Sequence, residues 1–293
     1  MTLVSEFAPA KINLTLRVLG RRPDGYHEIE SLVAFADIGD RLTLDTEASV
    51  GVETAGPFAG SIAGANLLAA TLDRLARLHP QLRLGRVHLD KHLPVAAGIG
   101  GGSADVAALI RAVRKVNPDL EGGIDWGAFG LSIGADVPVC LASRAAWMGG
   151  IGERVVPLGG SLPPLVTVLV NPLQPAPADK TAQVFKMLAA RPLAVSTAAV
   201  APAASAALRS RESLLAHLRQ VGNELAEAAA LVVPATATVL ETLRACEEVA
   251  HAAVSGGGPT CFGVVEGREA AHGVVQRIAA ARPGWWVAAA VLR

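Results

Sequence analysis

The sequence predicts an α/β fold, built as two α+β domains. Strand-like and helix-like patterns follow one another along the chain, and the sequence changes character between Gly149-Gly150 and Gly159-Gly160. With 293 residues, of which 51% are hydrophobic, the chain can bury a sizeable core. We therefore expect an N-terminal domain at residues 1–155 and a C-terminal domain at residues 156–293.

The N-terminal half begins with a segment, Ala10–Leu19, in which apolar and polar residues alternate, and this predicts a strand. Lys11 and Asn13 are two residues apart and therefore project from the same polar face of that strand. A turn is expected at Gly20–Gly25. Further strands are predicted at Ile29–Phe35, Arg41–Asp45 and Arg86–Asp90, and helices at Asn66–Leu78, at Val106–Val113 before the stop signal Asn117-Pro118, and at Trp126–Ile133.

The C-terminal half continues the mixture of patterns. Strands are predicted at Pro164–Val170 and Trp285–Leu292, and helices at Lys180–Ala189, Glu212–Gln220, Thr236–Cys246 and Glu269–Ala280. The segment Ala190–Ser210 is rich in Ala, Pro and Ser, and we expect a loop or a partly mobile insert there. A late glycine loop, Ser255–Thr260, lies between two strand-like runs.

The most specific segment is a glycine-rich loop at residues 94–103, which reads Pro-Val-Ala-Ala-Gly-Ile-Gly-Gly-Gly-Ser. Its glycines admit φ > 0 and can turn successive N–H groups toward an anion. The helix that follows adds unpaired N–H groups and the positive end of its dipole. A Walker loop would need lysine after Gly102, and a dinucleotide fingerprint would need glycine at Ser103. We therefore expect a third kind of triphosphate cradle, the alternative being a flexible loop before an ordinary helix.

Charge and cysteine usage narrow the class of protein. The 26 basic and 26 acidic residues give a net charge of zero, which favours neither nucleic acid nor an anionic membrane as a partner. Cys140, Cys246 and Cys261 lack metal-ligand spacing, and Cys140 and Cys261 lie in apolar, strand-like surroundings. No signal peptide or membrane-spanning run is evident, so we expect a cytoplasmic protein.

Several segments together resemble a known family. They are Pro9–Leu14, Arg22–His27, Leu93–Ala104, Gly134–Pro138 and Ser255–Gly263. In order and wording they are similar to the GHMP kinase superfamily, named for galactokinase, homoserine kinase, mevalonate kinase and phosphomevalonate kinase. Within it, the pairing of Asp-Gly-Tyr-His with Gly-Ala-Asp-Val-Pro resembles the kinases of the non-mevalonate isoprenoid pathway that act on 4-diphosphocytidyl-2-C-methyl-D-erythritol.

This resemblance implies a GHMP-kinase-like fold with its active site in the cleft between the domains. It implies ATP-dependent phosphorylation of the 2-hydroxyl of the cytidyl substrate, which needs a base near that hydroxyl. Asp136 is implied as this base, and Lys11 as the residue beside it that favours the alkoxide and orients the carboxylate. Taken alone, Asp136 is more typical of a residue that forms a turn or caps a helix, and Lys11 of a solvated charge on a strand.

The resemblance also implies the binding residues. Tyr26 and His27 would hold the cytosine by stacking and by hydrogen bonds to its edge, and Asn13 would contact the same substrate. Phe185 would offer a second aromatic ring, although a place in a helical core is an alternative for it. Nucleotide contacts are implied at Pro94, Val95, Ala96, Ala97, Gly98, Ile99, Gly100, Gly101, Gly102, Ser103, Ala104, Asn66 and Lys91.

ATP and Mg²⁺ are the expected cofactors. No metal ligand is assigned, although the Ser103 hydroxyl could touch a phosphate or the ion; as an alternative, or in addition, it could be the N-cap of the following helix. The expected partner is a small-molecule substrate, and the expected state is a monomer or a weak homodimer.

Two other functions are compatible with the sequence. One is another small-molecule kinase of the superfamily, of the mevalonate or homoserine type, but neither substrate carries a base for Tyr26 and His27 to bind. The other is a non-catalytic nucleotide-binding protein, against which the presence of both Lys11 and Asp136 argues.

Overall fold

The computed structural model describes residues 3–62, 66–177, 179–188 and 208–293, which gather into two compact units. The first unit comprises Met1–Ala10, Ile38–Val95 and Gly100–Ser143, and the second comprises Lys11–Asp37, Ala96–Ile99 and Arg144–Arg293. The two units interleave along the chain. The division of the sequence at residues 155 and 156 stays a prediction.

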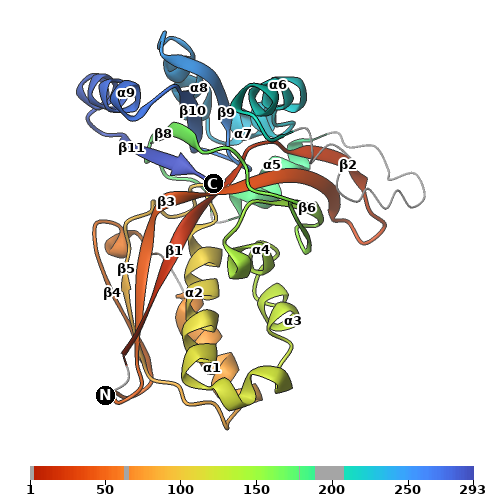
Figure 1. Ribbon diagram of the computed structural model, residues 1–293, viewed down its shortest axis with the longest axis vertical. Coiled ribbons are helices and arrows are strands. Elements are labelled where there is room, and N and C mark those ends of the chain that lie inside the picture. The colour runs from red at the N-terminus through yellow and green to blue at the C-terminus, as the bar shows by residue number, and fades with distance from the viewer. Residues whose placement is uncertain (1–2, 63–65, 178, 189–207) are drawn as a thin grey trace. The chain divides into compact units, whose positions relative to one another are not determined.

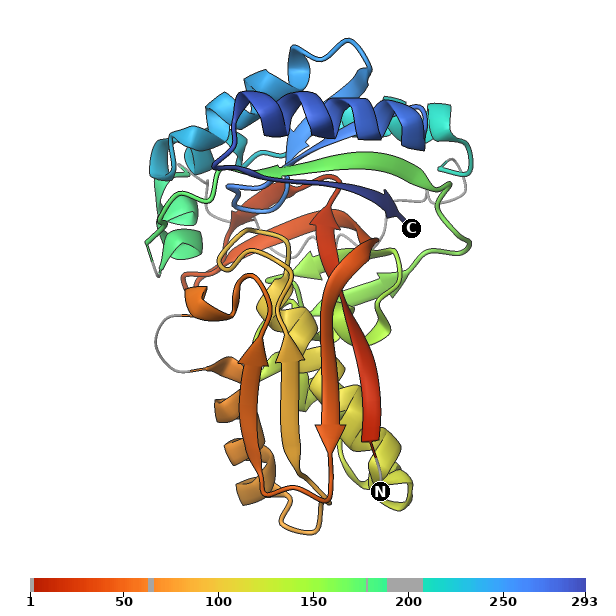
Figure 2. The same ribbon diagram turned by 90° about the vertical axis from the view of Figure 1, so that its left-hand side faces the viewer.

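The first unit is a sheet with helices on one face. Its elements are β1 (Leu3–Asn13) and β3 (His27–Asp45), both of which continue into the second unit, β4 (Gly51–Ala55), α1 (Leu67–Leu78), β5 (Arg86–Asp90), α2 (Gly101–Val116), α3 (Trp126–Leu131), α4 (Val137–Ala142), and the 3-10 helices Ala59–Ser61 and Pro118–Gly123. Strand β5 pairs antiparallel with β3 and parallel with β4. Figure 2 shows α1 and α2 behind these strands.

Helix α2 is the central helix of the first unit and contacts α1, α3 and α4. Its apolar residues from Val106 to Val113 recur at helical spacing and are buried, as the sequence predicts. The helix ends at Val116 because Pro118 follows two residues later and cannot continue it. The burial of this stripe fixes the axis of α2 and therefore the place of its N-terminus, where the glycine-rich loop ends.

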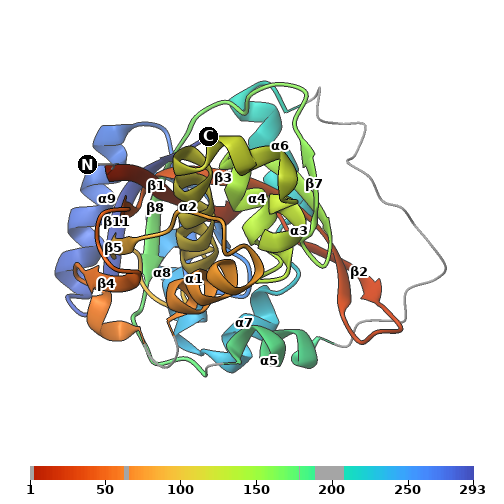
Figure 3. The ribbon, with the colours of Figure 1, turned by 90° about the horizontal axis from the view of Figure 1, so that it is seen from below.

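The second unit contains a sheet in the order β11-β8-β10-β9, in which all neighbours are antiparallel. Strand β3 pairs with β11, β2 and β6. Helices α8 and α9 pack on this sheet (Figures 1 and 2), and α5 lies beside α7 (Figure 3). The elements are β2 (Arg17–Arg21), β6 (Ala146–Gly150), β7 (Arg154–Pro157), β8 (Leu165–Asn171), α5 (Lys180–Met187), α6 (Arg211–Val221), α7 (Ala226–Val232), α8 (Ala235–Arg244), β9 (Val249–Val254), β10 (Cys261–Val265), α9 (Arg268–Ala281) and β11 (Trp286–Leu292).

The core of the second unit lies between this sheet and its helices. Helix α9 contributes Ala271, Val274 and Ile278, which share one face, and the strands contribute Val168, Val170, Val254 and Cys261. Cys140, Cys246 and Cys261 are all buried, which confirms Cys140 and Cys261 as small buried side chains. Within the described residues, no helix combines the length and the apolarity that crossing a bilayer requires.

The predicted strand Ala10–Leu19 is wrong as a single element. Strand β1 ends at Asn13 and β2 begins at Arg17. Between them the backbone N–H groups of Leu14 and Thr15 both donate to Leu32 O, at 2.8 and 3.3 Å, which interrupts regular pairing. In contrast, the predicted strands Ile29–Phe35 and Arg41–Asp45 belong to one continuous strand, β3.

The strand-like surroundings expected for Cys140 are also wrong, because Cys140 lies in helix α4. Pro138 stands in the first turn of α4, where a fixed φ favours a helix. The sequence pattern does not predict α7, whose alanines give no clear apolar period, or the short strands β4, β6 and β7. Most of the insert expected at Ala190–Ser210 lies outside the described residues.

Candidate active site

The glycine-rich loop has a left-handed backbone at every second residue. The angle φ is +54° at Ala96, +77° at Gly98 and +66° at Gly100, and no residue between them has a positive φ. Such alternation turns successive N–H groups toward one side and forms an anion-binding nest. The left-handed residues that such a cradle requires are therefore present, and the binding of phosphate there stays a prediction.

The carbonyl groups of this loop are turned toward protein donors. Each of four consecutive carbonyls accepts a hydrogen bond from elsewhere in the second unit: Ala96 O from Lys180 Nζ at 2.9 Å, Ala97 O from Thr260 N at 3.1 Å, Gly98 O from Ser255 Oγ at 3.0 Å and Ile99 O from Lys11 N at 2.9 Å. These bonds keep the negative ends of the peptide dipoles occupied. An anion that approaches the loop would therefore meet few exposed acceptors.

The N–H groups of the same loop are in the opposite situation. In the described part of the chain, the backbone N–H groups from Ala97 to Gly100 donate to no protein acceptor. The next residues, Gly101–Ser103, form the first turn of α2, where N–H groups have no partner within the helix. Free donors and occupied acceptors together suit a polyphosphate, with the helix dipole adding to the attraction.

Ser103 lies inside the first turn of α2 and is half-buried. The N-cap of α2 is Gly100, so the alternative assignment of Ser103 as the N-cap is wrong. The Ser103 hydroxyl lies near Gly134, since a Cβ built on that glycine would be 3.8 Å from Ser103 Oγ. Asn66 is the N-cap of α1, and its side chain accepts a hydrogen bond from Leu68 N at 2.9 Å.

The late glycine loop supports the cradle. The Ser255 hydroxyl accepts from Asn13 N at 3.2 Å and donates to Gly98 O at 3.0 Å, so one side chain connects β1, the late loop and the cradle. Asn223 Nδ2 holds the late loop by donating to Val254 O at 2.8 Å and to Gly256 O at 2.9 Å. The side chain of Asn13 donates to Ser31 Oγ at 2.8 Å.

Lys91 lies in a buried charge cluster just before the cradle. Its Nζ contacts Asp40 Oδ2 at 2.5 Å and Asp105 Oδ2 at 2.7 Å, and all three side chains are buried. Burial opposes the charge on Lys91, but the two carboxylates outweigh it and raise its pKa. Burial also raises the pKa of Asp105, against the attraction of the Lys91 ammonium.

This cluster also fixes the entrance to the loop. Asp40 Oδ1 accepts hydrogen bonds from His92 N at 2.6 Å and Leu93 N at 2.8 Å. A Cβ built on Gly101 would be 3.3 Å from Lys91 Nζ, which places the ammonium directly beneath the start of α2. The side chain of Lys91 is thus occupied by carboxylates, and its predicted contact with the nucleotide stays a prediction.

The two predicted catalytic residues occupy different units, and their pairing stays a prediction. Lys11 lies in the part of β1 that belongs to the second unit and is 3% exposed, which contradicts a solvated charge. Asp136 lies in the first unit, directly before α4. Its side chain makes no capping hydrogen bond to α4, so the carboxylate is not placed there as a helix cap.

The predicted cytosine-binding side chains lie in the second unit. The His27 and Phe185 rings are stacked on each other, with centroids 5.0 Å apart and planes inclined by 21°. This spacing is that of rings in direct contact and leaves no room for a base between them. Burial, and secondarily the charge of Arg21, lower the pKa of His27. Tyr26 is 59% exposed, and Phe185 also packs against the core of the second unit.

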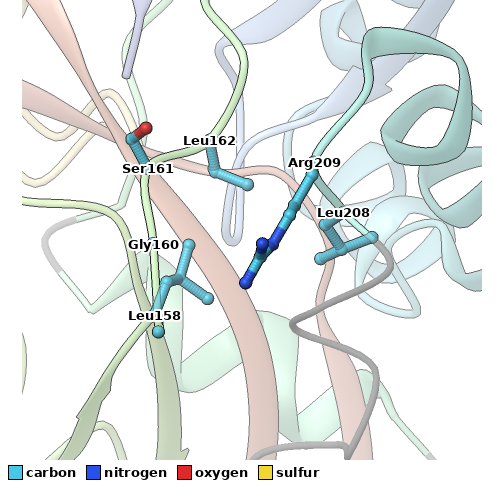
Figure 4. A pocket seen from close by; sticks show the side chains of 7 residues that line it. Leu158, Gly160, Ser161, Leu162, Leu208 and Arg209 are labelled. Atoms are coloured by element: carbon cyan, nitrogen blue, oxygen red, sulfur yellow. The ribbon is translucent and has the colours of Figure 1, made fainter.

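A separate cavity of about 340 Å³ opens in the second unit. It is lined by Leu158, Gly159, Gly160, Ser161, Leu162, Leu208 and Arg209. Figure 4 shows the Arg209 side chain extending between Leu158 and Leu208. None of the predicted site residues lines this cavity.

The structure adds two charged residues that the sequence patterns do not single out. Asp105 is one of them. The sequence feature that could have revealed it is an acidic residue on the apolar stripe of α2. Lys180 is the other. The sequence feature that could have revealed it is a basic residue at the beginning of a predicted helix, where a cation opposes the helix dipole.

Comparisons with known proteins agree with this geometry. Residues 64–144 match the family described as GHMP kinases N terminal domain, and residues 203–283 match GHMP kinases C terminal. The 4-diphosphocytidyl-2-C-methyl-D-erythritol kinase of Azorhizobium caulinodans is 44% identical over 98% of this chain and 98% of its own length.

Solved structures extend the likeness to the fold. A crystal structure of 4-(cytidine 5'-diphospho)-2C-methyl-D-erythritol kinase is 31% identical, with a TM-score of 0.74 over 99% of both chains. Mevalonate kinase from L. major has a TM-score of 0.67 over 100% of this chain and 96% of its own, but only 16% identity, which shows the fold alone. The predicted GHMP-kinase-like α+β fold is confirmed. The chain belongs to the 4-diphosphocytidyl-2-C-methyl-D-erythritol kinase family of GHMP kinases.

Proposed function

We propose that this kinase transfers the γ-phosphoryl group of ATP to the 2-hydroxyl of 4-diphosphocytidyl-2-C-methyl-D-erythritol, a step of the non-mevalonate isoprenoid pathway. The observation that carries the proposal is the 44% identity to a kinase of that name over 98% of both chains. The likeness to mevalonate kinase is confined to the fold and does not favour that alternative.

The nucleotide phosphates would bind at the cradle. The free N–H groups from Ala97 to Gly100 and the start of α2 supply donors, while the occupied carbonyls supply no competing negative charge. Within the described residues, no group of three or more His, Cys, Asp or Glu side chains is arranged to hold a metal ion. Mg²⁺ would arrive on the phosphates of the nucleotide, with the Ser103 hydroxyl as a protein ligand that fits.

Asp136 would remove the proton of the acceptor hydroxyl. It is suited to this role because it stands in the short loop between Gly134 and Pro138, directly before α4, where a carboxylate can be fixed in place. The buried ammonium of Lys11 would favour the charged form of Asp136 and stabilise the developing alkoxide. This pairing requires Lys11 and Asp136 to meet at the acceptor.

The cytidyl group would bind beside β2 and β3, at Tyr26 and His27. Since His27 and Phe185 already stack on each other, the cytosine would stack on the exposed Tyr26 ring and take hydrogen bonds from His27. Phe185 would then support the His27 ring from the other side, and Asn13 would contact the erythritol part. A cytoplasmic location and a monomeric or weakly dimeric state accompany this proposal.

Replacement of Asp136 by Asn tests the base. We expect turnover to fall by about 10²–10⁴-fold, the usual contribution of a general base, with both substrates still bound. Lys11→Ala should cause a similar loss, and the double variant should lose little more because the two residues act as one unit. Steady-state release of ADP measures all three. Near wild-type turnover of Asp136→Asn at neutral pH would rule out the assignment.

Replacement of Tyr26 by Ala tests the acceptor site. Stacking contributes about 1–3 kcal/mol per base, so the KM for the cytidyl substrate should rise several-fold or more while the KM for ATP is unchanged. His27→Ala should also weaken the preference for cytosine over uracil. The acceptor site is elsewhere if Tyr26→Ala raises both KM values equally, or if methylerythritol phosphate reacts as well as the cytidyl compound.

A further inference from the structure

Lys180 carries a buried cation whose partners are backbone carbonyls. It is the first residue of α5 and is 4% exposed. Its Nζ donates to Ala96 O at 2.9 Å and to Gly258 O. Burial lowers the pKa of Lys180 to about 8, so that at neutral pH most molecules keep the ammonium and its three donors.

The position of Lys180 does not help α5 itself. A cation at a helix N-terminus opposes the helix dipole, and a buried charge loses its hydration. In the described part of the chain, no carboxylate forms an ion pair with Lys180 that would compensate this loss. The contribution of Lys180 to the structure is therefore its pair of hydrogen bonds, one to a carbonyl of each glycine loop.

Ala96 is the partner that needs such a contact. Among the left-handed residues of the cradle it is the one with a side chain, and its φ of +54° is disfavoured for a residue with a Cβ. A strained residue keeps its conformation only where its surroundings fix it. The Lys180 ammonium fixes the Ala96 carbonyl, and the contact with Gly258 O ties that carbonyl to the late loop.

We propose that Lys180 is a positioning residue for the nucleotide triphosphate: it holds the Ala96 carbonyl turned away from the cradle, so that the N–H groups that follow face the phosphates. The inference rests on the proposed ATP-dependent function. Lys180 touches neither substrate in this account. It acts through the backbone conformation of Ala96.

The first test compares Lys180→Met with Lys186→Met, which removes an exposed cation from the same helix. Calorimetric titration with an unreactive ATP analogue should show at least tenfold weaker binding to K180M and unchanged binding to K186M. The Kd for the cytidyl substrate should stay within twofold in both. A merely structural role would lower the melting temperature of K180M without changing the affinity of the folded protein for the analogue, and this result would overturn the proposal.

The second test relieves the strain directly. Ala96→Gly removes the Cβ that disfavours the left-handed conformation, so K180M should weaken analogue binding by threefold or less in the A96G background. An equal loss in both backgrounds would show that Lys180 does not act through Ala96. If K180M does not fold, K180Q, which is too short to reach both carbonyls, replaces it in both tests with the same expectations. A wild-type protein that does not bind the analogue would overturn the proposed function and this inference with it, whereas equal affinities of wild type and K180M would overturn the role of Lys180 alone.

Discussion

The two halves of the glycine-rich loop use glycine for different reasons. In Ala96–Ile99, a Cβ added to Gly98 would lie 2.5 Å from Gly258 O and 2.8 Å from Ser255 O, and φ there is +77°. In Gly100–Ser103, a Cβ on Gly101 would meet Lys91 Nζ at 3.3 Å, and one on Gly102 would meet only a Leu67 methyl group, at 3.7 Å. The first half needs glycine for the protein's own packing, whereas in the second half Gly102 has space around it and Gly101 is close only to the end of a side chain.

This difference separates folding from ligand recognition within one motif. The first half is bound to the late glycine loop, so a change there disturbs the protein with or without nucleotide. The second half starts α2 and leaves its surface open, so a change there acts chiefly on whatever approaches the helix N-terminus. One sequence motif therefore contains some glycines whose replacement should lower stability and others whose replacement should weaken nucleotide binding.

Gly98→Ala should have the largest effect on stability. The new Cβ would overlap two carbonyl oxygens and would force an unfavourable φ, so we expect a loss of about 3 kcal/mol in the free energy of unfolding. Binding of the ATP analogue should also be lost or strongly reduced. Denaturant unfolding without nucleotide measures the first effect. A variant as stable as the wild type would show that the late loop moves aside easily, and the contrast between the two halves would fail.

Gly101→Ala should have a smaller effect than Gly98→Ala. It should change the affinity for nucleotide rather than the free energy of unfolding. Ala is a better helix former than Gly by about 1 kcal/mol, which offsets the close contact with Lys91 Nζ, so stability should change little. The methyl group would press on Lys91 Nζ and the Leu93 side chain and would shift the first turn of α2, whose N–H groups are proposed to meet the phosphates, so the Kd for the ATP analogue should rise several-fold. Calorimetry measures the Kd for the analogue, and denaturant unfolding of the same preparation measures the stability. A loss of stability with intact affinity would make Gly101 a packing glycine like Gly98.

Ser255→Ala should give the smallest effect on nucleotide affinity. It removes the hydroxyl that donates to Gly98 O and accepts from Asn13 N, and each net hydrogen bond contributes about 0.5–1.5 kcal/mol. We expect unfolding to become easier by about 1–2 kcal/mol, with at most a few-fold rise in the Kd for the analogue. Ser213→Ala, which changes a half-buried residue of the capping box of α6, is a control of similar chemistry. An effect on affinity without one on stability would place Ser255 at the ligand rather than behind the loop.

Much of the local structure follows from the chain alone. The apolar spacing of Val106–Val113, the stop at Pro118 and the turn residues of the glycine-rich loop predict the strand, loop and helix that form the cradle. The predictions that failed depend on distant partners. β1 and β2 are separate strands because Leu32 O captures the N–H groups of Leu14 and Thr15, and no pattern within residues 10–19 contains that information.

The same distinction holds for the site. The sequence by itself determined that a glycine-rich loop suited to phosphate leads into a helix at residues 94–104, because glycine's freedom at positive φ and the helix that follows are local properties. Only the tertiary structure decided which groups hold it: Lys180, Ser255, Thr260 and Lys11 reach its carbonyls from segments far away along the chain. It likewise decided that His27 stacks on Phe185 and that Lys91 is neutralised by Asp40 and Asp105. The physical reason is that backbone preferences act within a few residues, whereas the partner of a buried donor or charge is fixed by packing.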